Sequence, residues 1–317
     1  MESLNKAEQK CVGCLAQTLG GTNQSVVHRL CRFVSPLMSE FFGALIITVT
    51  IAFTNRTDEG FEAQNSLAPL AIGAMLTSML YSNGHISGAH FNPAVTMAVF
   101  VRGKITILTL VQYFCVQIAG AVAGASISER VIGENYLPVM AIDTARTTIG
   151  DAFLLEFLYT YALCTTVLNT ATTASLHGNQ FYGLAIGFVV LAAATSIGPV
   201  TGAALSPAVA TAFCVIHRSR GGSLWMYWIS ELLAGFSAGI IFHVTNNEEA
   251  DLRFLQKDIV QRHAAAVGGH TTTYHEKLVM PWRKTTEEEA RSSGVVHNGG
   301  ENEESETNNY NKNEKEP

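Results

Sequence analysis

Residues 87–96 read Ser-Gly-Ala-His-Phe-Asn-Pro-Ala-Val-Thr, and a related segment at 201–210 reads Thr-Gly-Ala-Ala-Leu-Ser-Pro-Ala-Val-Ala. Each segment predicts a glycine-containing loop that runs into a short helix. Asn92 and Ser206 suit the N-cap position, because their side chains can accept the free N–H groups of the first turn. A proline suits the next position. The apolar helix after each proline is about ten residues long, whereas about twenty are needed to cross a bilayer. We therefore expect two half-spanning helices, which begin at the boxes Asn92-Pro93-Ala94 and Ser206-Pro207-Ala208.

The composition indicates a polytopic membrane protein. The chain has 317 residues, of which 48% are hydrophobic and only 15% charged, and its mean hydropathy is +0.21. Its apolar residues lie in long runs without the polar face that a soluble helical bundle needs. Charge-poor stretches long enough to span a bilayer occur at residues 35–54, 67–84, 106–127, 149–172, 180–199 and 223–244.

The two halves of the chain repeat each other. Leu-Ala-Ile-Gly at 70–73 recurs at 184–187, and this separation of 114 residues (184 − 70) also separates Asn92 from Ser206. At the same offset, Tyr113 and Gln117 reappear as Tyr227 and Glu231. Each repeat, about 36–130 and about 149–245, holds three spans and one half-helix. Because three is odd, the second repeat must be inverted in the membrane. The predicted fold is all-α, with six transmembrane helices and two re-entrant half-helices.

Inverted half-helices would meet N-terminus to N-terminus near the middle of the membrane. Each N-terminus carries about half a positive charge, so the meeting point repels cations and orients water dipoles. The loops before the half-helices place non-helical backbone at membrane depth, which is tolerated only where it is buried in protein or lines a cavity. We therefore expect the carbonyl groups of these loops to line an aqueous pore.

The two boxes and their inverted arrangement resemble the aquaporin, or major intrinsic protein, family over residues 36–245. The resemblance implies a six-helix barrel that assembles as a homotetramer in the lipid bilayer, with one pore per subunit. It implies that Asn92 donates to passing solute at the midplane. It also implies that Glu40 and Glu156 are buried and brace the re-entrant loops by accepting backbone N–H bonds. From the residues alone, a solvated carboxylate at a helix end is the alternative for both.

The second box departs from the family pattern Asn-Pro-Ala-Arg, since Ser206 to Ala208 is followed by Val209. The resemblance implies that the missing arginine would have formed a cationic constriction, and valine has neither its charge nor its fork of donors. The serine can still cap the half-helix. The remaining constriction positions align with Ile72, Ala194 and Ala203, where water-selective members use an aromatic residue, a histidine and a small residue. The predicted constriction is wider and apolar.

This constriction leaves three functional classes open. We favour a passive channel for water and for small neutral solutes such as glycerol, urea, ammonia or hydrogen peroxide. An apolar ring can also dewet and close, which fits a non-conducting or gated structural or regulatory member. Loss of the arginine favours a weakly ion-conducting channel as a third class. No nucleophile–base set or cofactor motif is present, so we expect no enzymatic activity, no cofactor and no nucleic-acid partner.

The terminal segments differ from the channel domain at 35–245. Residues 1–34 and 246–317 are polar, and we expect two cytoplasmic tails, the second acidic and mostly disordered. The expected location is the plasma membrane or an intracellular vesicle or vacuole membrane. Asn55 begins a glycosylation sequon close to the membrane. Four N-terminal residues have spacing that could bind zinc, although such a set is more often incidental and we expect no metal site: Cys11, Cys14, His28 and Cys31.

Overall fold

The structure is a computed structural model that describes residues 24–56, 67–140, 142, 147–173, 176, 179–217 and 223–246. The chain divides after Arg283 into two compact units, and all described residues belong to the first. The helices within the described ranges are α2 (Gln24–Thr54), α3 (Ala68–Ser87), α4 (Pro93–Val101), α5 (Ile107–Ile132), α6 (Ile149–Ala171), α7 (Tyr182–Thr201), α8 (Pro207–Ile216) and α9 (Leu224–Thr245), with a 3-10 turn, η2, at Glu134–Tyr136.

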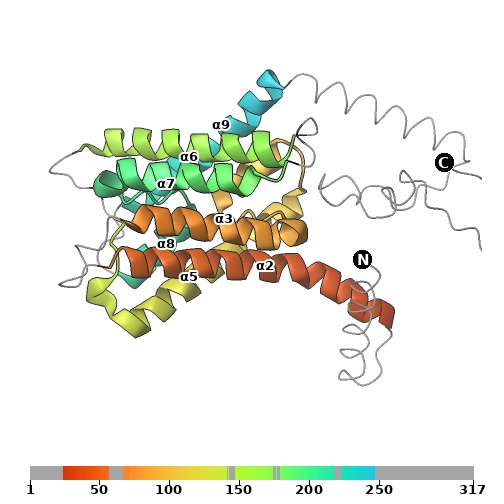
Figure 1. Cartoon of the computed structure of the whole chain (residues 1–317), viewed down its shortest axis with the longest axis horizontal. Coiled ribbons are helices and arrows are strands. Elements are labelled where there is room, and N and C mark those ends of the chain that lie inside the picture. The colour runs from red at the N-terminus through yellow and green to blue at the C-terminus, as the bar shows by residue number, and fades with distance from the viewer. Residues whose placement is uncertain are drawn as a thin grey trace, which may run out of the picture. The chain divides into compact units, whose positions relative to one another are not determined.

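Six of these helices are long and two are short, as the sequence predicts. Five of the long helices are also apolar enough to cross a membrane by length and composition. The remaining long helix, α3, has 20 residues but carries several polar side chains in its second half, among them Ser82, Asn83 and His85. Its neighbours on either side are α2 and α7, and α6 packs beyond α7. These four helices run side by side in Figure 1.

The first of the described helices, α2, is longer than the sequence predicts. It begins at Gln24 and contains Pro36, whereas the apolar run alone put the start of the first span at residue 35 and left 1–34 as a tail. Backbone hydrogen bonding does not require apolar side chains, so the helix extends beyond the segment that hydropathy can detect.

Equivalent glycines of the two repeats touch at the crossing of α3 and α7. A Cβ atom added to Gly73 would lie 2.7 Å from the Gly187 carbonyl oxygen, and one added to Gly187 would lie 2.6 Å from the Gly73 oxygen. These are the last residues of the repeated Leu-Ala-Ile-Gly segments. Equivalent residues can meet in this reciprocal way only on an axis that relates the repeats, so the contact places the inverted-repeat axis between α3 and α7.

Small residues also hold the half-helix α4 close to a spanning helix. A Cβ on Gly235 of α9 would lie 2.2 Å from the Ala94 carbonyl oxygen, and one on Gly239 would lie 3.1 Å from that of Ala98. Glycine at this spacing lets two helix backbones approach without intervening side chains. The close approach fixes the first box against the second repeat.

Candidate functional site

The two half-helices begin with nearly identical backbone geometry but different caps. Asn92 has φ −151° and ψ 124°, and its Oδ1 accepts from the backbone N–H of Ala94 at 2.8 Å. Ser206 has φ −151° and ψ 118° but makes no side-chain cap bond. Its hydroxyl oxygen is buried and has no hydrogen-bond partner among the described residues. The prediction that Ser206 caps α8 with its side chain was therefore wrong, because its hydroxyl bonds to no N–H group of the first turn.

The loops before the half-helices share an unusual backbone. Positive φ values occur at Gly88, Ala89 and Phe91 in the first loop and at Gly202, Ala203 and Leu205 in the second. These positions match one by one at the repeat offset. Alanine, phenylalanine and leucine rarely adopt this region without strain, which persists only where the surroundings enforce it. Both loops are therefore held in place by other parts of the molecule.

Glu40 of α2 holds the first loop. Its Oε1 accepts from the Ser87 hydroxyl at 2.6 Å and the His90 backbone N–H at 2.9 Å. Its Oε2 accepts from the Phe91 backbone N–H at 2.6 Å and from Nε2 of Gln117 at 2.8 Å. Glu40 is completely buried, so four donors surround this carboxyl group in place of water.

Glu156 of α6 holds the second loop with fewer and longer bonds. Its Oε1 accepts from the Thr201 hydroxyl at 2.6 Å and the Ala204 backbone N–H at 3.2 Å. Its Oε2 accepts from the Leu205 backbone N–H at 3.2 Å. It is also completely buried. Both carboxyl groups thus lie where the family resemblance expects the loop braces.

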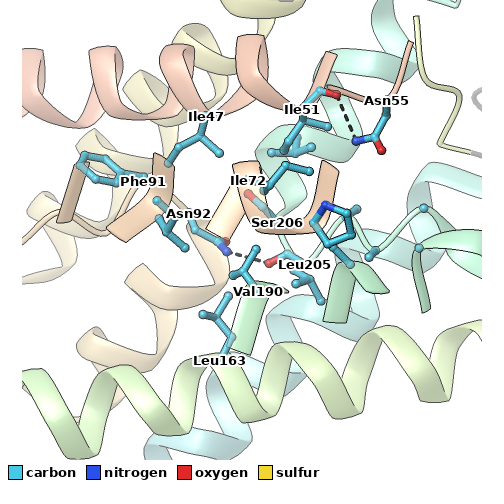
Figure 2. A pocket seen from close by; sticks show the side chains of 18 of the residues that line it. Ile47, Ile51, Asn55, Ile72, Phe91, Asn92, Leu163, Val190, Leu205 and Ser206 are labelled. Carbon is cyan, nitrogen blue, oxygen red and sulfur yellow. Dashed lines mark hydrogen bonds between the residues drawn. The ribbon is translucent and has the colours of Figure 1, made fainter. Parts of the chain in front are cut away.

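A hydrogen bond joins the two loops at the centre. Nδ2 of Asn92 donates to the Leu205 carbonyl oxygen at 2.7 Å, as the dashed line in Figure 2 shows. A primary amide carries two N–H groups, and Asn92 also lines the cavity. One N–H therefore ties the repeats together.

A cavity of about 570 Å³ runs past both boxes. In Figure 2, Ile47 and Ile51 of α2 lie on one side of it, and Leu163 of α6 lies on the opposite side. None of its lining residues is Asp, Glu, Lys or Arg; its polar side chains are those of Asn55, His90, Asn92, Thr195 and Ser206. The cavity is thus mostly apolar, with a few polar groups concentrated at the boxes.

All four residues of the predicted constriction line this cavity, namely Ile72, Ala194, Ala203 and Val209. Ile72 and Val209 are buried, with 6% and 5% of their surface exposed. The structure brings the four together from α3, α7, the second loop and α8. No side chain among them can carry a charge or donate a hydrogen bond.

Residues 138–140 line the cavity, although no sequence pattern predicts them there. Pro138, Val139 and Met140 follow η2 and line the cavity. Met140 is buried, and its sulphur would lie 2.9 Å from a Cβ on Gly202. The available signal was an apolar cluster, including Leu137 and Ile142, within a linker that is otherwise too short and polar to span a membrane.

The remaining candidate residues are Asn55 and the four N-terminal residues with zinc-like spacing. Asn55 lines one end of the cavity, and its Nδ2 donates to the Ile51 carbonyl oxygen at 3.1 Å. Of the proposed zinc ligands, Cys11, Cys14 and the His28 side chain fall outside the described residues. Cys31 is a free, half-buried cysteine on α2.

Comparison with known proteins decides the family. The family model described as Major intrinsic protein matches residues 23–242. The chain belongs to the major intrinsic protein family. It is 31% identical to aquaporin TIP1-1 of Arabidopsis thaliana over 65% of this chain and 85% of that protein. It is 31% identical to a probable TIP-type aquaporin of Medicago truncatula, over 71% of this chain and 91% of that protein.

A solved structure supports the fold. The chain superimposes on the aquaglyceroporin from Plasmodium falciparum with a TM-score of 0.57 and 18% identity, covering 69% of this chain and 99% of that one. Membership of the major intrinsic protein family makes the chain an integral, multi-pass membrane protein and a transmembrane channel for water and small solutes.

Proposed function

We propose that this member of the family conducts water together with small neutral solutes, with a selectivity more relaxed than that of a water-only pore. The observation that carries the proposal is Val209, which lies in the cavity wall at the position where the family resemblance expects arginine. With Ile72, Ala194 and Ala203 it forms a ring without charge or donors. A ring of this kind cannot select by side-chain hydrogen bonding, so the size of a solute and its cost of leaving water discriminate.

Two further features support passage of neutral solutes over ions. The N-termini of α4 and α8 both lie at the cavity, through Asn92 and Ser206. Their partial positive charges oppose cations. The mostly apolar wall also offers an ion little replacement for its hydration shell. A neutral polyol loses less hydration free energy than an ion when it enters such a cavity.

Osmotic swelling of liposomes tests this proposal. Purified protein would be reconstituted and assayed in parallel for water and glycerol flux, with the variants Val209→Arg and Val209→Thr. We expect glycerol uptake in the unchanged protein, strong suppression by Val209→Arg, and retention by Val209→Thr, which keeps the shape of valine. Water flux without glycerol flux in the unchanged protein would overturn relaxed selectivity. Flux equal to that of empty liposomes would overturn the channel proposal for this chain.

We also propose a homotetramer with both termini in the cytoplasm. An even number of spans puts both termini on one side. One face of α9 exposes large apolar side chains, including Ile229, Leu233 and Phe236, which suits contact with lipid or a neighbouring subunit. Native mass measurement in detergent tests the assembly, and labelling of single cysteines placed in each tail of intact cells tests the orientation.

A further inference from the structure

Behind Ser206 lies a second buried carboxyl group that the loop brace does not use. Glu231 of α9 is completely buried. Neither of its carboxyl oxygens has a hydrogen-bond partner of normal geometry among the described residues, although the backbone N–H of Ser206 lies near it. Glu156 is close enough to act on it electrostatically. An ionised carboxylate without partners is very costly inside a protein, so this group needs a different explanation.

The equivalent position in the first repeat shows what is missing. Gln117 donates from Nε2 to Glu40 at 2.8 Å and lies 2.9 Å from the Thr96 hydroxyl oxygen. In the second repeat, glutamate replaces glutamine at 231 and alanine replaces threonine at 210. An amide always carries donor hydrogens, whereas a carboxyl group can donate only when it is protonated. The second repeat has thus exchanged a permanent donor for one that depends on a proton.

Other buried polar groups face the same place. Glu156, Thr160 and Cys164 follow one another at four-residue spacing on α6, so they share one helix face. Both Glu156 and Cys164 interact electrostatically with Glu231, which puts Glu231 opposite that face. Thr160 between them is completely buried, and its hydroxyl has no partner among the described residues. The Ser206 hydroxyl, also buried and unpaired, connects this region to the pore.

None of the groups that face Glu231 can neutralise it as a cation. The helices that pack against α9 are α6, α4 and α8. Their titratable groups here are Glu156 and Cys164 on α6 and Cys214 on α8, while α4 has none. On α9 itself, Tyr227 lies one turn before Glu231 and donates to the Thr201 carbonyl oxygen, and His243 lies at the far end beside Val101. Two carboxyl groups in such surroundings share a proton rather than both ionise.

We propose that Glu156 and Glu231 form a proton-binding site behind Ser206, and that the bound proton stabilises the pore loop at residues 202–206. With the proton present, Glu231 donates to Glu156 as Gln117 does to Glu40. Without it, two negative charges repel each other, and Glu156 loosens its hold on Ala204 and Leu205. Those bonds, at 3.2 Å each, are longer than the bonds from Glu40 to His90 and Phe91. Protons reach the site from pore water by way of the Ser206 hydroxyl.

Infrared spectroscopy of the reconstituted full chain tests proton binding directly. We expect a protonated-carboxyl absorption on the acidic side of a pH titration that disappears on the alkaline side. Glu231→Gln should abolish this titrating absorption. The matched control Glu134→Gln, at an exposed position, should leave it unchanged. Gln117→Glu should add a second absorption, because it builds the same pair beside Glu40. An absorption unaffected by Glu231→Gln, or absent from the unchanged protein, would overturn the proposal.

Proton loss from this site should also change water flux, an effect that rests on the proposed channel function. It is measured in a separate experiment. Water permeability of the unchanged protein should fall severalfold on the alkaline side, while Glu231→Gln should hold its acidic-side value at every pH. Equal pH dependence in both proteins would overturn control of the loop. The infrared result is independent of conduction, so failure of the channel proposal and failure of the proton site can be told apart.

Discussion

The Asn92 side chain donates a 2.7 Å hydrogen bond to the Leu205 carbonyl oxygen, which belongs to the other repeat. The same side chain caps α4 through its Oδ1. One residue therefore fixes its own half-helix and joins the two loops that form the pore. Ser206, at the equivalent position, does neither with its side chain. The inverted repeat is symmetric in backbone but not in its central hydrogen bonds.

Asn92→Asp should separate these two roles. Aspartate keeps an oxygen for the Ala94 N–H but turns an oxygen towards the Leu205 carbonyl in place of an N–H. Leaving buried polar groups unpaired costs about 1–3 kcal/mol, so the apparent unfolding temperature in detergent should fall and water permeability should drop. Asn169→Asp, a half-buried position near the end of α6, is the matched control. If both variants lower the unfolding temperature equally, the hydrogen bond between the loops contributes no more to stability than the bond at the control position.

Ser206→Asn should restore the missing cap. The backbone angles at 206 already match those at 92, so asparagine can accept from the N–H of the first turn of α8 without rearrangement. A good N-cap contributes about 1 kcal/mol, and the thermal unfolding midpoint should rise. A lowered midpoint would mean that the space around Ser206 cannot hold the amide.

Gly187→Ala should disrupt the contact on the repeat axis. Its Cβ would lie 2.0 Å from Oγ1 of Thr77 and 2.6 Å from the Gly73 carbonyl oxygen, and the second of these is backbone that cannot move aside. Overpacking of this kind costs about 1–3 kcal/mol. Gly198→Ala on the same helix α7 is the matched control, because nothing lies within 4 Å of its Cβ. The thermal unfolding midpoint in detergent should fall for Gly187→Ala and stay unchanged for Gly198→Ala.

The repeat and the boxes were readable from the sequence because they are local. A common offset of 114 residues located both half-helices, and the proline boxes set the helix starts. Glu40 and Glu156 were placed by resemblance to the family, and both lie beside the backbone N–H groups of the loops.

Other features of the site depend on distances between side chains, which cannot be read from the sequence. Ser206 has the right residue type for a cap, yet only the geometry shows that its hydroxyl makes no cap bond. Glu231 was visible as the counterpart of Gln117, but its lack of partners emerges from the packing of α6 against α9. The contribution of Met140 to the pore depends on how its linker folds over Gly202, which no local pattern predicts.

Arg102→Lys should weaken the end of the barrel where α4, α6 and α9 meet. Arg102 is completely buried. It donates from Nε to the Thr172 hydroxyl at 2.5 Å and from Nη2 to the Thr172 carbonyl oxygen at 2.7 Å. Its guanidinium also lies 4.0 Å from the centre of the Phe242 ring. Lysine keeps the charge but cannot reproduce a planar fork that bonds at two points and stacks on a ring.

The expected loss is about 1.5–3 kcal/mol, the range for hydrogen bonds to charged groups, measured as a lower unfolding midpoint in detergent. Arg130→Lys, at an exposed position near the end of α5, is the control and should change stability by less than about 0.5 kcal/mol. Equal midpoints for the two variants would show that charge alone, rather than the fork and the ring contact, holds α4 to its neighbours. Water permeability measured alongside would show whether this anchor also keeps the first pore loop in place.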